Sequence, residues 1–198
     1  MHGLICKGFE LFVRATWSDA DWLAIARRAK IDPPELEAME MYGEDMLPRL
    51  VFSSSRVLRR PPSALLEDAG HWIVTDPGLD SVRRLVRFAG PTYEELLWSL
   101  GELRARGRLA VPGLDLPECR LEERGPGDYR ILLHWPMPGA AAVLAGLLRA
   151  MADDYGVLAL IDRPPCTSRP GGWDGVVDVQ LVDLSHAEGR DFAFGAAS

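Results

Sequence analysis

The sequence is poor in cysteine and in net positive charge, and each shortage excludes a class of protein. Its three cysteines, Cys6, Cys119 and Cys166, are odd in number and far apart, which argues against a disulfide framework. The formal net charge is −7. A nucleic-acid-binding protein needs a basic face to displace counterions from phosphate, and docking on anionic lipid needs one as well. We therefore expect neither nucleic acid nor a membrane surface as a partner.

Long apolar runs are missing too. No stretch approaches the roughly 20 apolar residues that a transmembrane helix requires. The apolar start, residues 1–13, is interrupted by Lys7 and Glu10, so it makes a poor signal-peptide core. These absences predict a cytoplasmic protein without a membrane span.

The residue combinations of common catalytic sites are not recognisable either. Spacing supports no Ser-His-Asp or Cys-His set, and the sequence has no phosphate-binding loop and no CxxC pair. On this basis we expect no enzymatic activity. What the sequence does have is 47% hydrophobic content over 198 residues, enough for one well-buried domain with a short tail.

The first half of the chain has a helical pattern. A capping-box-like start at Ser18 precedes an apolar run, and the pair Pro33-Pro34 follows that helix. One of these prolines opens a short predicted helix through Met41. Further predicted helices cover residues 44–58, 64–73, 79–88 and 91–106.

The pattern changes after Pro112-Gly113. A hairpin signal, Arg124-Gly125-Pro126-Gly127, separates two predicted strands. Helices that come first and a sheet that comes late predict an α+β fold with an antiparallel sheet. The elements expected in this half are strands over 119–123, 129–135, 157–161 and 176–182 and a helix over 139–153.

A segment in the middle of the chain resembles a known family. Gly101-Glu102-Leu103-Arg104 follows a helical run, Gly113 comes nine residues after Arg104, and Pro117 four residues after that. Together with the amino terminus, Met1-His2-Gly3-Leu4-Ile5 and Gly8-Phe9, this resembles the haem-nitric-oxide/oxygen-binding family, H-NOX or HNOB. In that family a helix carries the histidine that ligates haem iron, and a glycine and a proline follow at these spacings.

The resemblance covers residues 1–184 and implies the fold of the family. We expect a helical amino-terminal part, followed by a part that holds a four-stranded antiparallel sheet and helices. Within a single domain over 1–184, the helical subdomain would span about residues 1–60 and the haem-pocket and sheet subdomain about 61–184. Residues 185–198 are expected to form a weakly ordered tail.

The resemblance also shows that the family's haem-binding residues are changed here. Arg104 stands at the position of the iron-ligating histidine, and an arginine has no lone pair to give a metal. The family's tyrosine-x-serine-x-arginine motif, which binds the haem propionates, aligns with residues 134–138. There His134, Pro136 and Pro138 replace the tyrosine, the serine and the arginine. The joint change at four positions predicts that the usual haem site is lost and that no cofactor is bound.

The other ligand-pocket positions implied by the resemblance are mostly apolar. They are Ile5, Phe9, Ile73, Val143 and Pro117. In a haem-containing relative, apolar residues at Phe9, Ile73 and Val143 would imply selectivity for nitric oxide, because no tyrosine would hold bound oxygen. Without haem they predict only an apolar cavity between the two halves. Pro117 keeps the position of the family's structural proline and favours a role in turning the chain into the sheet.

Arg104 also has a plainer explanation. An arginine near the end of a helix is commonly solvated or ion-paired, and Glu94, Glu95 or Glu102 could be the partner. The functional alternative is that Arg104 binds an anionic ligand in the former haem cavity.

Two functions are therefore open. The leading hypothesis is a haem-free H-NOX-like sensor or signalling module that acts through another ligand or through protein–protein contacts. Bacterial members of the family signal to a separate protein, so the resemblance implies a cyclase, phosphodiesterase or histidine kinase acting in trans. The second hypothesis is a haem-binding nitric oxide sensor with His134 or His71 as the axial ligand, although such a histidine is more often a packed or surface residue. A homodimer built on exposed tryptophans is a third, weaker idea.

Overall fold

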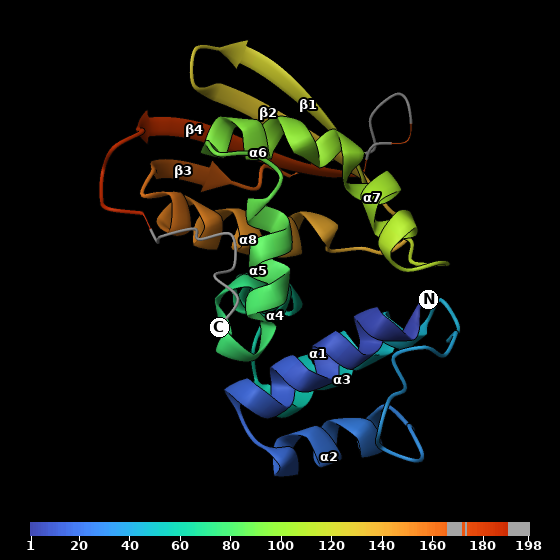
Figure 1. Ribbon diagram of the computed structural model, residues 1–198. Helices are drawn as coiled ribbons and strands as arrows, with labels where there is room; N and C mark the ends of the chain where they lie inside the picture. Colours follow the sequence, from blue (N-terminus) through green and yellow to red (C-terminus); the bar gives the residue numbers. More distant parts are fainter. Residues whose placement is uncertain (166–171, 173, 190–198) are drawn as a thin grey trace, which may run out of the picture.

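The helices and strands occupy different parts of the molecule in the computed structural model, which describes residues 1–165, 172 and 174–189. Three helices lie together at one end, and α4 leads from them toward the sheet (Figure 1). The α+β fold expected from the sequence is confirmed. The helices of this first part are α1 (Gly3–Thr16), α2 (Asp19–Arg28), α3 (Met46–Leu58) and α4 (Pro62–Thr75).

The rest of the described chain builds a sheet and the helices that cover it. Its strands follow the order β1-β2-β4-β3, and every neighbouring pair is antiparallel. The helical elements are η1 (Pro77–Leu79), α5 (Asp80–Arg87), α6 (Tyr93–Ser99), η2 (Leu100–Glu102), α7 (Leu103–Ala110) and α8 (Ala140–Tyr155). The strands are β1 (Glu118–Gly125), β2 (Asp128–His134), β3 (Leu158–Asp162) and β4 (Gly175–Asp183).

Strand register separates an apolar face of the sheet from a polar one. Tyr129 of β2 lies opposite Val179 of β4, and both side chains pack into the core that the helices share. The hydroxyl of Tyr129 donates to Glu94 of α6 over 2.8 Å, which places α6 on this face. On the other face Arg130 lies opposite Asp178 and binds it. The alternation follows from the two-residue period of a strand.

Local signals begin and end the elements as the sequence suggests. The Oγ atom of Ser18 accepts the N–H of Asp21 over 3.1 Å, so the predicted start of α2 is confirmed. Thr92 and Glu95 form a capping box at α6. Gly156 ends α8 with a φ of 73°, a left-handed conformation that costs glycine nothing in steric terms.

The short helix predicted through Met41 is wrong. Residues 33–41 contain no helix, because their backbone groups bond to α1 instead. The N–H of Leu36 donates to the buried carboxylate of Glu10 over 2.9 Å, and the carbonyl of Glu40 accepts the N–H of Gly3 over 2.7 Å. Backbone groups used in this way are not available for a helical ladder.

The single helix predicted over residues 91–106 is also wrong, because the chain divides there into α6, η2 and α7. Gly101 lies in the 3-10 turn between the two α-helices. Glycine is less favourable than alanine in a helix interior by about 1 kcal/mol. The break matters for the site, because Arg104 belongs to α7 and not to the helix that precedes it.

Helices α4 and α8 cross unusually closely, and glycines make the approach possible. A Cβ atom on Gly70 would overlap the carbonyl oxygen of Val143, and one on Gly146 would overlap that of Glu67. The two backbones therefore touch where α4 meets the helix beneath the sheet. This contact joins the amino-terminal helices to the sheet half.

No helix in the described ranges is long and apolar enough to cross a membrane. The proposed division of residues 1–184 into two subdomains stays a prediction. Of the predicted tail, residues 190–198 lie outside the part of the chain that the structure describes, as does Cys166.

Candidate functional site

Arg104 lies in the first turn of α7 and is held by two carboxylates that follow the helix. Its Nε atom donates to Oδ1 of Asp115 over 3.0 Å, and its guanidinium also lies 3.3 Å from Oε2 of Glu118. The Arg104 side chain is 32% exposed. The plainer explanation, an ion-paired arginine, is therefore confirmed for this residue.

The partners suggested for Arg104 are wrong. Glu102 pairs with Arg106 over 2.7 Å, Glu94 accepts the hydroxyl of Tyr129, and Glu95 caps α6. Each of these carboxylates lies on or before the helix and is used locally. Asp115 comes after α7 has ended at Ala110, so the helical pattern of the sequence does not predict its contact with position 104.

Asp115 is the centre of this cluster. Arg108, one turn after Arg104, donates to the same Oδ1 atom over 2.8 Å. Partial burial alone would raise the pKa of Asp115, but hydrogen bonds from Arg108 and Arg104 outweigh it and hold the pKa below its ordinary value. The indole N–H of Trp135 donates to the backbone carbonyl of Asp115 over 3.1 Å and so fixes the loop from the sheet side.

Ion pairs contribute a large part of the free energy that holds α7 against the rest of the domain. No residue of α7 is buried, and the helix packs against η2 and β1. Gly107 lies close to Leu116, whereas Leu109 is 87% exposed. A helix without a buried apolar stripe gains little from the hydrophobic effect. The ion pairs to Asp115 and Glu118 therefore carry unusual weight in positioning it.

The apolar pocket positions come from three helices. Ile5 and Phe9 lie on α1, Ile73 on α4 and Val143 on α8. Phe9 is buried beside Phe12, and the other three are half-buried against the core. Since Gly70 touches the backbone of Val143, Ile73 follows one turn further along α4 from the crossing of the two helices.

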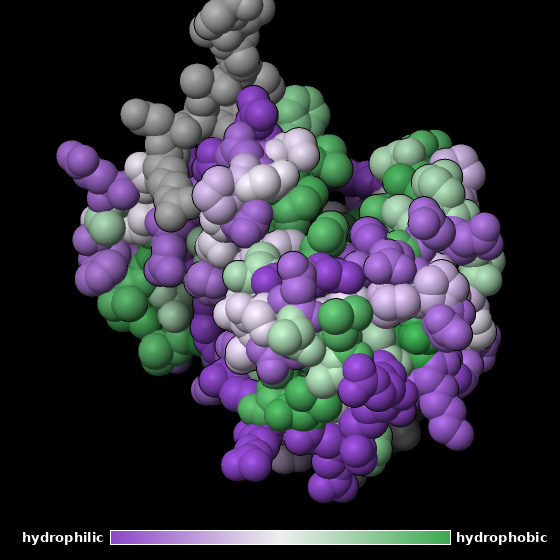
Figure 2. All heavy atoms as spheres, turned by 90° about the horizontal axis from the view of Figure 1, so that it is seen from below, coloured by the Kyte–Doolittle hydropathy of each residue, from purple (hydrophilic) through white to green (hydrophobic). Residues whose placement is uncertain are grey.

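Seen from the end where α2 lies, the surface is hollowed between its two sides, and hydrophobic side chains gather near the rim (Figure 2). The Arg104 side chain binds Asp115 and Glu118, which lie outside the apolar positions on α1, α4 and α8. The structure thus groups Ile73 with Val143 and places Arg104 in a separate, charged cluster.

Pro117 and the former propionate positions lie at the entrance to the sheet and at the end of β2. Pro117 is half-buried between the two acids that bind Arg104. His134 ends β2, is exposed, and has its Nδ1 atom 3.6 Å from a carboxylate oxygen of Asp174. Pro136 and Pro138 are exposed. A proline side chain has no hydrogen-bond donor for a propionate.

His71, the other candidate axial ligand, is exposed on α4. Its Nδ1 atom lies 3.4 Å from the hydroxyl oxygen of Thr75, one turn later. This is an ordinary contact along a helix surface.

These residues do not fit haem in the manner of the family. The ligand position holds a guanidinium that is occupied by carboxylates, and two of the three propionate positions have no donor. In the described chain, the buried side-chain atoms without a hydrogen-bond partner belong to Ser54, Arg87, Arg149 and Asp154, and none is at these positions. The site residues therefore leave no buried polar side-chain atom unpaired that could bind a prosthetic group.

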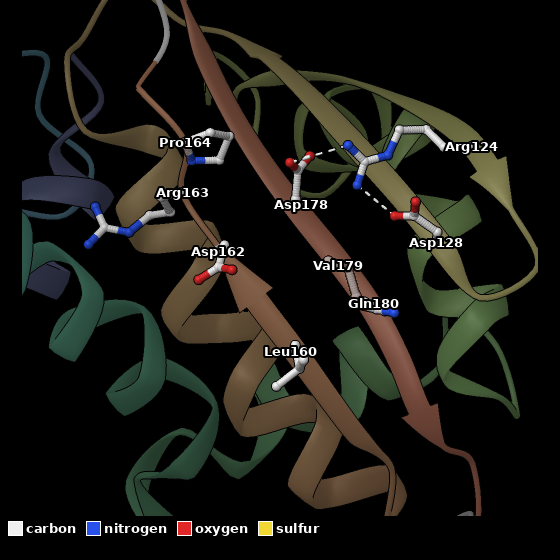
Figure 3. Close-up of a pocket in the computed structure, with 9 residues that line it drawn as sticks. All are labelled: Arg124, Asp128, Leu160, Asp162, Arg163, Pro164, Asp178, Val179 and Gln180. Carbon is white, nitrogen blue, oxygen red and sulfur yellow. Dashed lines mark hydrogen bonds and ion pairs between the residues drawn. The ribbon is translucent and has the colours of Figure 1, made fainter.

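A groove of about 520 Å³ lies elsewhere, on the polar face of the sheet between β3 and β4 (Figure 3). It contains none of the predicted site residues. Arg124 spans part of it, donating to Asp128 over 2.6 Å and to Asp178 over 3.3 Å. The pKa of Asp178 is lowered, mainly because Arg130 donates hydrogen bonds to its carboxylate. Because its arginines are already paired internally, this groove is a weak candidate for binding an anion.

Comparison with known proteins gives one family and one fold. The family model of haem-NO-binding (HNOB) domains matches residues 2–159. An H-NOX protein from S. oneidensis in the Fe(II)NO ligation state is 16% identical, with 92% of this chain and 100% of that chain covered and a TM-score of 0.77. The Fe(II) unliganded H-NOX protein from K. algicida is 15% identical, with coverages of 92% and 97% and a TM-score of 0.76. No curated protein sequence matches the chain significantly.

Proposed function

This chain belongs to the haem-NO-binding (H-NOX) family, whose domains are sensor modules, and we propose that it is a member that signals without the usual haem ligation. It acts through another ligand or through contacts with a partner protein, and it has no enzymatic activity of its own. The observation that carries the proposal is the ion pair between Arg104, at the ligand position, and Asp115. A guanidinium stays protonated in proteins and cannot ligate iron.

The propionate side of the site supports the same proposal. A buried haem carboxylate needs cationic or hydroxyl partners, and the chain offers Pro136 and Pro138 where such groups are expected. His134, at the third position, already lies near the carboxylate of Asp174.

Signalling in this family passes between domains and partner proteins. We propose a partner in trans in the cytoplasm, of the cyclase, phosphodiesterase or histidine kinase kind. A ligand can drive such signalling only if it binds two arrangements of the domain with different affinity. Helix α7 is a suitable mobile element, because ion pairs at its surface do much of the work of holding it.

An absorption spectrum of protein expressed with added haem precursor tests the proposal. We expect no Soret band at stoichiometric haem in the range of about 350 to 650 nm, where porphyrins absorb. Arg104→His should increase haem binding, because it returns an imidazole to the ligand position. The matched control is Arg106→His, two residues along the same helix and paired with Glu102, which should not. A wild-type protein that carries about one haem per chain would overturn the proposal.

One observation favours a second candidate, a haem-based nitric oxide sensor with an unusual axial ligand. The Nδ1 atom of His134 faces Asp174, which leaves Nε2 available, and a carboxylate behind a histidine is the usual support of a metal ligand. If this candidate is right, His134→Ala abolishes the haem spectrum. His71→Ala tests the other histidine in the same way, and unchanged spectra in both variants would exclude it.

A homodimer would use Trp98 of α6, which is 52% exposed and touches the ring of Tyr129. Trp22, by contrast, belongs to the core. Light scattering that shows a monomer at high concentration would count against the dimer.

A further inference from the structure

His2 lies where three segments that are far apart in the sequence meet. Its side chain caps α1, because its Nδ1 atom accepts the N–H of Leu4 over 3.2 Å. Its backbone faces Met41 across a short antiparallel bridge. The edge of its ring lies against the turn after α7, since a Cβ atom on Gly113 would be 3.7 Å from its Cδ2 atom. Only 5% of His2 is exposed, so the imidazole is enclosed between these segments.

The contact between His2 and Gly113 joins the two parts of the domain at a second place. In Figure 1 the amino terminus lies beside the turn that follows α7, whereas α4 joins the two parts nearer the middle of the molecule. The crossing of α4 and α8 brings two backbones into direct contact. The contact at His2 is between one ring and one glycine, so it can open without a change in that crossing.

Helix α7 and the turn that follows it are attached to each other. A Cβ atom on Gly107 would lie 3.8 Å from a side-chain carbon of Leu114, which is buried in the turn. Asp115, next to it, binds two arginines of α7. Since no residue of α7 is buried, the helix can shift, and a shift carries Gly113 toward His2 or away from it.

The start of α1 is tied on its other side to the segment before α3. The N–H of Gly3 donates to the carbonyl of Glu40 over 2.7 Å. The N–H of Tyr42 donates to the carbonyl of the residue before His2 over 2.9 Å. Because these bonds flank His2 in the sequence, a movement of its backbone is passed to residues 37–42.

We infer that His2 couples the position of α7 to the arrangement of residues 37–42. With the turn against its ring, His2 is held in the cap of α1 and in the bridge. When the turn withdraws, water reaches the ring and both attachments loosen. Met39 and Met41 in this segment are 77% and 64% exposed, and methionine is enriched at protein interfaces. The surface that changes with α7 is therefore one that a partner protein can contact.

This inference deepens the proposed function, on which its role in signalling rests. The contact between His2 and Gly113 consists of protein atoms alone. The absorption spectrum that tests the proposed function and an exchange experiment on this contact can therefore fail independently of each other.

Two substitutions at His2 separate its cap from its ring contact. Serine is among the best residues at the start of a helix, but it has no atom at the place where Cδ2 meets the turn. Asparagine is an equally good cap, and its Oδ1 and Nδ2 atoms take the places of Nδ1 and Cδ2. His2→Ser should therefore break the coupling, and His2→Asn should keep it.

Hydrogen exchange on the full chain measures the coupling when α7 is loosened by Asp115→Asn. This change should speed the exchange of residues 103–116 in every background. In residues 37–42 it should speed exchange about threefold in the wild type and in His2→Asn, but not in His2→Ser. The control background is Ser18→Asn, which alters the cap of α2 instead and should behave like the wild type.

Two results would overturn the inference. The first is an effect of Asp115→Asn on residues 37–42 that is equal in the wild type and in His2→Ser, because the coupling would then follow another route. The second is the absence of any effect on these residues in the wild type. Unchanged exchange in α8 across all variants shows that the domain remains folded.

Discussion

Replacing Gly146 by alanine should destabilise the protein, although alanine is the better helix former. A Cβ atom at this position would lie 2.8 Å from the carbonyl carbon of Glu67 and 2.9 Å from the amide nitrogen of His71, both backbone atoms of α4. Non-bonded carbon atoms prefer about 3.5–4.0 Å, so α4 and α8 must separate by about 1 Å. Overpacking of this kind costs about 1–3 kcal/mol, and the loosened contacts add to it. The propensity gain of about 1 kcal/mol offsets part of this, which leaves a net loss of about 2 kcal/mol.

Urea unfolding followed by circular dichroism measures the loss of free energy of unfolding. In thermal unfolding the same loss should lower the melting temperature by about 4–8 °C in a chain of this size. The matched control is Gly8→Ala on α1, where a Cβ atom would have no neighbour within 4 Å. That variant should gain about 0.5–1 kcal/mol. If Gly146→Ala were as stable as the control, the close crossing of α4 and α8 would be refuted. Gly70→Ala should also destabilise, and the double variant should lose less than the two single losses added, because one separation relieves both overlaps.

Three further outcomes follow from the side chains already described. Asp115→Asn should lower the free energy of unfolding in urea by about 1 kcal/mol, because the acid is partly exposed. The control Asp45→Asn, which breaks a single exposed ion pair with Arg49, should lower it by less than about 0.5 kcal/mol. The pKa of Asp115 is lowered on folding, so its stabilisation is present above the ordinary value of 3.8 and is lost as the pH falls through the lowered pKa; a wild-type advantage over Asp115→Asn that did not shrink as the pH is lowered from 3.8 would contradict the ion pair. Burial raises the pKa of Cys6 to about 11 and that of Cys119 to about 12, so in a Cys166→Ser variant both thiols should react with Ellman's reagent only slowly until urea is added; prompt reaction of the folded protein would show that they are accessible.

The sequence predicts most of the elements, because their signals are local. The start of α2 at Ser18 needs one side chain and an amide three residues away, and the two strands around Gly125 need a turn and alternating residues. The failure before Met41 has a tertiary cause. The buried carboxylate of Glu10 binds the amide of Leu36 across 26 residues, and no local pattern reports such a contact.

The candidate site shows the same limit. Resemblance to a family identifies position 104 as unusual, and the chemistry of arginine explains why that matters. The identity of the partner, Asp115, depends on how the chain turns after α7 and on Trp135, which bonds to the backbone of that turn. Arg104 and Asp115 are eleven residues apart, but α7 ends at Ala110, so it is the turn of the chain after the helix that brings the two together.

The bond between Arg104 and Asp115 is made entirely of protein atoms. It therefore exists as soon as the chain has folded, and its formation waits for no supply of a prosthetic group. It is also indifferent to the oxidation state of a metal and to dissolved gases, which have no chemistry with a guanidinium or a carboxylate. What does weaken it is dissolved salt, because the screening length falls to about 3 Å at 1 M ionic strength. The strength with which α7 is held therefore depends on the ionic strength of the solution around the protein.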